Sequence, residues 1–341
     1  MDRRAAYAVE LAQGLARFFE PRRATCPWCG STRIALLQRS ADLIQRKPGE
    51  FVLDRCADCR HVFQNPCLSP AGLAFYYRDF YDGLGEATMN RVFAKQTEWY
   101  RQRAELIAAH ADPAEWLDVG CGHGHFCHTA HQLLPRTAFD GLDFGDGVEI
   151  AQRHGRIRRA FRGEFAELAP ELTERYDVVS MHHYLEHSTD QRRELATALK
   201  VLRPGGLLLI EVPDPESPWG RLLGKWWVGW MQPQHLHFAP RANLRAALTE
   251  LGFTVLSDTT DRAAVTQGWT GALMQLAHTL LPPPDFPWLP RPSRFRLLLR
   301  NLGLTAAVPL IALSALLGWL VRPIVRARGL HNSYRIVARK N

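Results

Sequence analysis

Acidic residues are missing from one end of this chain: the segment from Phe286 to Asn341 contains no aspartate or glutamate. The same segment carries ten arginines and lysines, and the net charge of the whole chain is +8, so the rest of the chain is slightly acidic. Positive charge confined to one end argues against a nucleic-acid surface over the remainder. We therefore expect no nucleic-acid partner, and we expect residues 286–330 to meet an anionic membrane surface.

A secretory signal is also lacking. Residues 1–22 are predicted to hold an N-terminal amphipathic helix, but Asp2 and Glu10 interrupt its apolar run and no small-residue cleavage site follows. With 341 residues, of which 46% are hydrophobic and 22% charged, the chain can bury a full core. We expect a cytoplasmic protein at the inner face of the membrane.

Cysteine is scarce, and its spacing is informative. Four of the seven cysteines form two C-x-x-C pairs, Cys26 with Cys29 and Cys56 with Cys59. Paired knuckles in a cytosolic chain are typical of a tetrahedral zinc site. We predict a zinc-ribbon-like domain over residues 23–70 with structural zinc, a metal-free remnant and a redox role being the alternatives. The other cysteines have no partner at metal spacing, and we expect them to be buried: Cys67, Cys121 and Cys127.

The glycine-rich stretch after residue 119 lacks the last glycine of a dinucleotide-binding loop, because His125 stands there. Residues 116–119 are predicted to form a buried strand, and three glycines follow it at every second position, so the backbone can turn sharply and a ligand can approach it. Asp143 ends the next predicted strand, at the distance typical of an acid that binds a ribose diol. Asp118 would repel a pyrophosphate but suits S-adenosylmethionine, which carries an ammonium and a sulfonium and no phosphate.

These residues resemble the first motif of the class I S-adenosylmethionine-dependent methyltransferases, an acid and one residue followed by G-x-G-x-G, here from Asp118 to Gly124. Leu-Arg-Pro-Gly-Gly at 202–206 is a second shared feature. The resemblance, in a branch that begins with a zinc-ribbon-like segment, implies that the following residues contact the cofactor: Asp118, Gly120, Cys121, Gly122, Gly124, Asp143, Phe144, Glu164, Phe165 and His182.

The fold class follows from the alternation of predicted strands and helices after residue 111, which indicates a parallel α/β sheet with helices on both faces. The resemblance implies a Rossmann-like seven-stranded sheet in the order 3-2-1-4-5-7-6 with the last strand antiparallel. We expect this domain over 111–262 plus 331–341, preceded by linker and lid helices over 71–110. An aromatic run at 75–81 is expected to pack between domains or to line a pocket.

Candidate catalytic residues follow the fourth predicted strand. His183, Glu186 and His187 stand at i, i+3 and i+4, so a helical turn would place them on one face. In the ubiquinone O-methyltransferase branch of the resembled family, an acid stands where His183 does and the set holds a divalent metal. Three interpretations stay open: a metal site, a loop-orienting pair, and a general base, which a histidine with a pKa near neutrality can provide.

A tryptophan-rich segment, 213–238, contains two further candidates, His235 and His237. Its length and aromatic content indicate either a flexible lid over the acceptor or a surface that touches lipid. The two histidines either contact the methyl acceptor or are packed against backbone.

Residues 263–330 form a hydrophobic insert between the last two strands, and 302–321 is an uncharged run of 20 residues. A single crossing would leave the final strand on the wrong side of the bilayer. We therefore expect an interfacial or re-entrant helical hairpin in preference to a true span or a soluble cap. Taken together, the sequence predicts a membrane-associated enzyme that methylates oxygen or carbon of a quinone precursor, sugar or similar small or lipid-linked acceptor. A zinc-ribbon RNA methyltransferase and a non-catalytic binding module are the alternatives.

Overall fold

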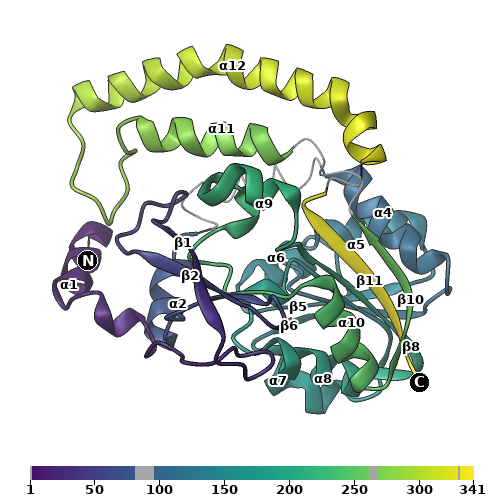
Figure 1. Ribbon diagram of the computed structural model, residues 1–341. Helices are drawn as coiled ribbons and strands as arrows, with labels where there is room; N and C mark the ends of the chain where they lie inside the picture. Colours follow the sequence, from purple (N-terminus) through teal and green to yellow (C-terminus); the bar gives the residue numbers. More distant parts are fainter. Residues whose placement is uncertain (1, 81–95, 261–266, 329–330) are drawn as a thin grey trace. The chain divides into compact units, whose positions relative to one another are not determined.

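The computed structural model describes residues 2–80, 96–260, 267–328 and 331–341 (Figure 1). The chain divides into two compact units, which we describe separately. The ribbon unit comprises Met1–Glu86, Asp214–Pro240 and Ala264–Asn332, and the sheet unit comprises Ala87–Pro213, Arg241–Ala263 and Ser333–Asn341.

The sheet unit contains one seven-stranded sheet in the order β10-β11-β8-β7-β4-β5-β6. Its strands are β4 (Glu115–Val119), β5 (Ala138–Asp143), β6 (Ala160–Arg162), β7 (Tyr176–His182), β8 (Leu202–Pro213), β10 (Phe253–Thr260) and β11 (Ser333–Lys340). All neighbours are parallel except β11, which runs antiparallel to both β8 and β10. The predicted order and the antiparallel last strand are confirmed.

Helices cover both faces of this sheet, and α7, α8 and α10 lie together along one of them (Figure 1). The helices and 3-10 turns are α4 (Thr97–Ala108), α5 (His125–Leu133), α6 (Gly147–Arg153), α7 (Phe165–Leu168), η2 (Ala169–Leu172), η3 (Leu185–His187), α8 (Gln191–Val201) and α10 (Arg241–Glu250). Of the expected linker and lid helices over 71–110, residues 81–95 lie outside the described residues, and α4 begins at Thr97.

The starts of two strands in the sheet unit are irregular. Strand β6 begins at Ala160, and Ile157 before it packs in the main apolar core. Strand β8 begins at Leu202, so residues 203–206 of the shared Leu-Arg-Pro-Gly-Gly motif belong to the strand. The pairing of β7 with β8 is shifted there, from Tyr176 with Leu202 to Val178 with Leu207, so the strand absorbs the extra residues as a bulge.

The ribbon unit is built on a small antiparallel sheet in the order β1-β2-β3-β9. The strands are β1 (Ile34–Ser40), β2 (Phe51–Cys56), β3 (Val62–Gln64) and β9 (His237–Phe238). The helices and 3-10 turns are α1 (Arg3–Ala12), η1 (Ala16–Phe18), α2 (Pro70–Tyr77), α9 (Pro218–Leu223), η4 (Gly224–Trp226), η5 (Val228–Trp230), α11 (Gln267–Leu280) and α12 (Arg294–Ala327). Strands β1 and β2 pair as an antiparallel hairpin within the region predicted to be ribbon-like.

Three of the four tryptophans in the tryptophan-rich segment lie in the core of the ribbon unit, which corrects the interpretation of the segment as a lipid-facing surface. Trp219, Trp227 and Trp230 are buried and pack with Leu53, Val325 and neighbouring apolar side chains. Trp227 and Trp230 pack edge to face, with their ring centroids 4.8 Å apart. Large aromatic rings that pack together in this way bury much apolar surface. The segment therefore holds the ribbon unit together.

The aromatic run at 75–81 also packs inside the ribbon unit. Phe75 and Tyr76 are fully buried in a cluster with Phe18 and Trp288. Phe18 and Phe75 stack with their ring centroids 4.4 Å apart. Tyr81, the last residue of the run, lies outside the described residues. Packing is thus the role of the part of this run that the structure describes.

Candidate active site

The glycine loop follows β4 in the sheet unit and turns as predicted. Gly120, Gly122 and Gly124 all have left-handed backbone, with φ of +76°, +52° and +70°. A Cβ at Gly120 would come within 2.9 Å of Tyr184, and one at Gly124 within 2.9 Å of Ala151, so these two positions are closed by packing. A Cβ at Gly122 would meet no atom of the described residues within 4 Å. The backbone is therefore open to a ligand at Gly122.

Asp143, at the end of β5, fixes this loop. Its Oδ2 accepts a hydrogen bond of 2.9 Å from the Gly122 amide, and its Oδ1 accepts one of 2.8 Å from the Gly145 amide. Each carboxylate oxygen retains a lone pair for a further donor. A ribose diol beside the glycine loop would find both oxygens already oriented.

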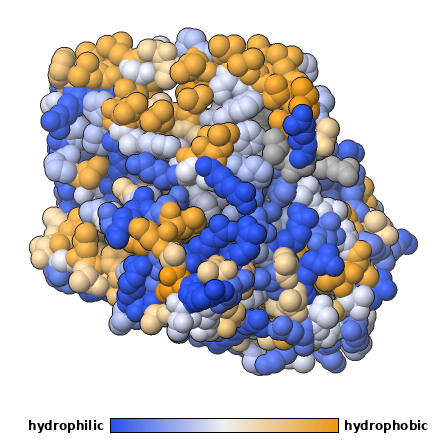
Figure 2. Space-filling model, in the orientation of Figure 1, coloured by the Kyte–Doolittle hydropathy of each residue, from blue (hydrophilic) through white to orange (hydrophobic). Residues whose placement is uncertain are grey.

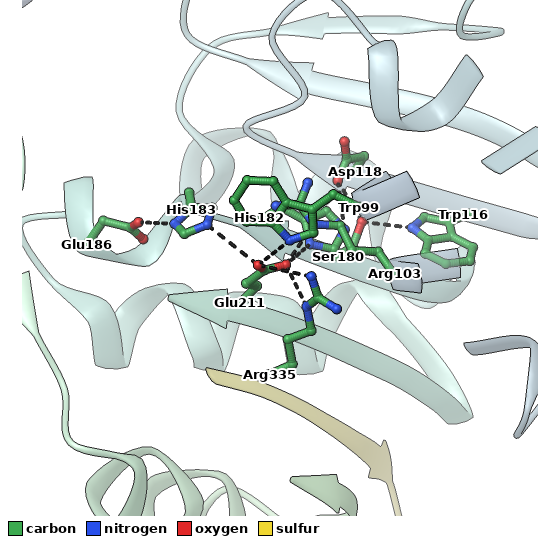
Figure 3. Close-up of polar contacts among 10 residues, drawn as sticks. All are labelled: Trp99, Arg103, Trp116, Asp118, Ser180, His182, His183, Glu186, Glu211 and Arg335. Atoms are coloured by element: carbon green, nitrogen blue, oxygen red, sulfur yellow. Dashed lines mark hydrogen bonds and ion pairs between the residues drawn. The ribbon is translucent and has the colours of Figure 1, made fainter. Parts of the chain in front are cut away.

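Asp118 lies at the end of β4 and is buried, with 3% of its surface exposed. Its Oδ1 accepts a hydrogen bond of 2.6 Å from the Ser180 hydroxyl, which in turn accepts one of 2.8 Å from the Trp116 indole (Figure 3). Burial raises the pKa of Asp118 to about 7, although the Ser180 hydroxyl and the charge of Arg103 oppose the shift. A cationic ligand nearby would favour its charged form.

Glu211, near the end of β8, is the centre of a polar network at this edge of the sheet. It was not among the site residues predicted from the sequence. Its carboxylate is fully buried and lies 2.7 Å from Arg103 Nε and 2.9 Å from Arg335 Nε. The Trp99 indole donates a hydrogen bond of 3.0 Å to it (Figure 3). Burial alone would raise the pKa of Glu211, but the two arginines hold it well below its usual value. An acid late in the apolar strand 207–212 was the signal in the sequence.

His183 follows β7 with φ of +52°, so the expected helical turn that would align it with Glu186 and His187 does not form. The 3-10 turn η3 begins only at Leu185. His183 Nδ1 nevertheless lies 2.9 Å from Glu186 Oε1, and its Nε2 lies 3.6 Å from Glu211 Oε1 (Figure 3). His183 and Glu186 are therefore brought together by a strained backbone and a charge pair.

The remaining predicted cofactor contacts differ in environment. Phe144, directly after β5, is 77% exposed, whereas Phe165, at the start of α7, is fully buried. Glu164 immediately precedes α7, and Cys121 is buried within the glycine loop. His182 is buried at the end of β7 against the Phe126 ring, and burial lowers its pKa well below the usual value, so it is neutral.

Comparison with known proteins shows what the sheet unit is similar to. Residues 93–258 match a family model described as a methyltransferase domain. A ubiquinone biosynthesis O-methyltransferase of Saccharophagus degradans is 31% identical over 144 residues, which is 40% of this chain and 60% of that protein. A probable S-adenosylmethionine-dependent methyltransferase of Mycolicibacterium smegmatis is 30% identical over 135 residues, 38% of this chain and 51% of that protein. Residues 93–258 are therefore similar to the methyltransferase domains of S-adenosylmethionine-dependent enzymes.

These matches are partial, because they span 51% and 60% of the length of the two relatives. Among solved structures, the 1,6-didemethyltoxoflavin-N1-methyltransferase of Burkholderia thailandensis has a TM-score of 0.45 and 17% identity, covering 84% of this chain and 97% of that one.

The charge of His183 bears on whether it can be a general base or a metal ligand. Burial by itself would lower the pKa of His183, but Glu186 and Glu211 outweigh burial and raise the pKa to about 9. The ring is therefore protonated at neutral pH and cannot accept another proton. A metal ligand must be unprotonated, so His183 would have to lose this proton to bind a metal ion.

The other two candidate histidines belong to the ribbon unit. His235 Nδ1 lies 2.8 Å from the carbonyl oxygen of Gly229, and His237 Nδ1 lies 3.1 Å from His61 Nε2 on the small sheet. Both rings are buried. The contact of His235 matches the alternative of a histidine packed against backbone, whereas His237 contacts another side chain.

The four knuckle cysteines converge in the ribbon unit. Their sulfur atoms all lie within 4.8 Å of one another, and the pairs Cys26 with Cys59 and Cys29 with Cys56 are 3.6 Å apart. Four thiolates around a zinc ion, with Zn–S of about 2.3 Å, lie roughly 3.8 Å apart at the corners of a tetrahedron. The sulfur cluster fits that geometry.

We expect replacement of Gly122 by arginine to abolish binding of S-adenosylmethionine, because the new side chain would fill the one open approach to the loop. Gly205→Arg is the matched control: this glycine also has left-handed backbone and open surroundings, but it lies at the opposite edge of the sheet, near the start of β8. Isothermal titration calorimetry measures both affinities, and circular dichroism checks both folds. Equal affinity in the two variants would contradict the assignment.

Proposed function

We propose that the protein transfers the methyl group of S-adenosylmethionine to oxygen or carbon of a small or lipid-linked acceptor, such as a quinone precursor or a sugar. The observation that carries the proposal is the open Gly122 backbone flanked by the Asp143 and Asp118 carboxylates at the carboxyl edge of the sheet. Open α/β sheets bind their ligands at this edge. The named ubiquinone O-methyltransferase relatives support an acceptor of this class.

The cofactor, when bound, supplies a methyl group that its sulfonium already activates, so the protein has to align the acceptor and remove its proton. Asp143 would hold the ribose, and the buried Asp118 would provide negative charge near the ammonium. His183 is protonated and serves to hold Glu186 and Glu211 in place. His187, at the end of η3, is then the candidate general base in the sheet unit.

Methyl transfer is tested by the release of S-adenosylhomocysteine when the protein is mixed with S-adenosylmethionine and an extract of bacterial cells, divided into lipid and water-soluble fractions. We expect the lipid fraction to support release with the wild type and Gly205→Arg, but not with Gly122→Arg. His187→Ala should lower turnover by about 10²–10⁴-fold with little change in cofactor affinity. Release from neither fraction would refute the proposal, and unchanged turnover in His187→Ala would refute the base.

We also propose that the four-cysteine cluster holds structural zinc. All four coordination positions would be taken by thiolates, so the ion would stabilise the ribbon unit and leave no site for catalysis. The hairpin of β1 and β2 places Cys56 at the end of β2, while Cys26 and Cys29 precede β1. The sulfur geometry described above supports this assignment.

Zinc is tested by the metal content of the purified full-length protein. We expect one zinc per chain in the wild type and a loss of zinc, with a lower Tm, in Cys56→Ser. Cys67→Ser is the control, because Cys67 is buried but belongs to no described metal-ligand group. Retention of zinc by Cys56→Ser, or its absence from the wild type, would contradict the assignment.

We further propose that α12 lies on the membrane surface. The helix Arg294–Val325 is long and apolar enough to span a bilayer. Only 11% of its most apolar 18-residue stretch is buried, so this stretch is largely exposed. Twelve large apolar side chains on α12 are exposed: Phe295, Leu298, Leu299, Leu302, Val308, Leu310, Leu313, Leu316, Leu317, Trp319, Leu320 and Ile324. Figure 2 shows the apolar band that runs over this side of the molecule.

Both ends of α12 are attached to the ribbon unit, which favours the interfacial arrangement over a re-entrant hairpin or a span. In the segment before the helix, Trp288 is buried and its indole donates a hydrogen bond of 2.7 Å to the Gln45 carbonyl. Near the other end, Val325 is buried with Trp219 and Trp227. Insertion across the bilayer would require these contacts to break. A helix held along the surface can bury its outer face in the headgroup region.

Membrane binding is tested by flotation with vesicles that contain anionic lipid. We expect the wild type to float and to be released by carbonate, and we expect the double variant Leu313→Asp and Leu320→Asp to float roughly tenfold less, because each change removes apolar area on one face of the helix. Leu133→Asp, at an exposed leucine of α5, is the control. Failure to float would refute the proposal, and resistance to carbonate would indicate a true span.

A further inference from the structure

A pocket in the ribbon unit has no part in the proposed methyl transfer or in the cysteine cluster. It has a volume of about 210 Å³ and lies between the first strands of the small sheet and the segment of α9 and η4. The pocket is therefore large enough for a small polar group.

The polar groups that line it are hydrogen-bond donors from four separate elements. Arg55 comes from β2, Arg221 from α9, Gln38 from β1 and Trp230 from η5. The buried amide nitrogen Nε2 of Gln38 and the indole nitrogen Nε1 of Trp230 have no hydrogen-bond partner among the described residues. A buried donor without a partner costs about 1–3 kcal/mol, so such groups are usually satisfied by a ligand or by water.

The described lining of the pocket carries net positive charge, with two guanidinium groups and no carboxylate. The nearby Glu216 forms its ion pair with Arg60, at 2.8 Å. The charge of Glu216 also acts on Arg55, but no described ion pair joins it to Arg55 or Arg221. Two arginines that face one pocket without an acid favour an anionic occupant.

The arrangement of donors distinguishes the class of anion. A single arginine can satisfy a carboxylate with two parallel hydrogen bonds. Here the donors come from four elements around the pocket, which suits a tetrahedral oxyanion that accepts hydrogen bonds in several directions. We propose that this pocket, which we name the Arg55 and Arg221 pocket, binds a phosphate or diphosphate group.

Apolar side chains surround part of the entrance. Leu37 and Val62 contribute to the lining, and Leu37 and Leu222, the residue after Arg221, are both exposed. An apolar rim beside a cationic interior fits both the headgroup of a phosphorylated lipid and a free phosphorylated metabolite. The shared chemistry is the phosphate, and the source is decided by experiment.

The test measures binding of inorganic phosphate and pyrophosphate to the full-length protein by calorimetry, without methyl donor or acceptor, so its outcome is independent of the proposed activity. We expect the wild type to bind pyrophosphate and expect Arg221→Gln and Arg55→Gln each to weaken binding by about tenfold. Arg39→Gln is the matched control, because this exposed arginine also lies on the small sheet and pairs with Glu50. Arg221 is exposed, so its replacement leaves the fold intact even if the Arg55 variant unfolds.

A second arm uses phosphatidylcholine vesicles with and without phosphatidic acid. Loss of phosphatidic-acid-dependent binding in Arg221→Gln, with Arg39→Gln unchanged, would assign the group to a lipid headgroup. Pyrophosphate binding that depends on Arg221 while vesicle binding does not would assign it to a soluble molecule. The proposal is overturned if neither probe binds, or if Arg221→Gln and Arg39→Gln bind both probes as the wild type does.

Discussion

The buried carboxylate of Glu211 sets the main constraint on the sheet unit. A fully buried negative charge is stable only when positive groups compensate it, and here Arg103 and Arg335 do so from positions 108 and 124 residues away in the sequence. Loss of either arginine would leave part of the charge unpaired, at a cost of about 3–5 kcal/mol. Helix α4, strand β8 and the last strand β11 are therefore joined by one charge as well as by packing. The antiparallel β11 completes the sheet. It also places Arg335 at the edge of the sheet where the glycine loop lies.

The same edge shows how burial and partners divide the roles of similar side chains. His182 and His183 are neighbours in the sequence, yet burial keeps His182 neutral while Glu186 and Glu211 keep His183 protonated. Groups whose pKa values are pushed apart in this way can take different parts in one site. His183 is a positive charge held between two carboxylates. It can therefore have an electrostatic role in the site without acting as a base. The left-handed backbone of His183 is the conformation that brings its ring between the two acids.

The sequence allowed the sheet to be predicted because its signals are local. Apolar strands alternate with helices, and the glycines and Asp143 stand at characteristic spacings, so the strand order and the loop followed from pattern and resemblance. The polar network could not be predicted in the same way, since Glu211, Arg103 and Arg335 meet only through tertiary pairing. The two-residue strand β9 gave no periodic signal, and it forms because β3 offers it an edge. The tryptophans of 213–238 were predicted to lie in a lid or at a lipid-facing surface. Composition alone does not show which residues will pack against a tryptophan ring.

The ribbon unit illustrates why the hydrophobic insert is not an independent addition. Val325 of α12 and Trp269 of α11 pack in or against the cluster that contains Trp219, Trp227 and Trp230, and Trp288 fills the cluster around Phe75. Without the insert, these rings would lose part of their cover, and large aromatic side chains contribute much of the burial energy in a small domain. The unit thus requires three distant segments of the chain to form its core. That requirement holds α12 along the ribbon unit. The side of the helix that faces the unit packs in its core, so the apolar side chains on the other side are exposed.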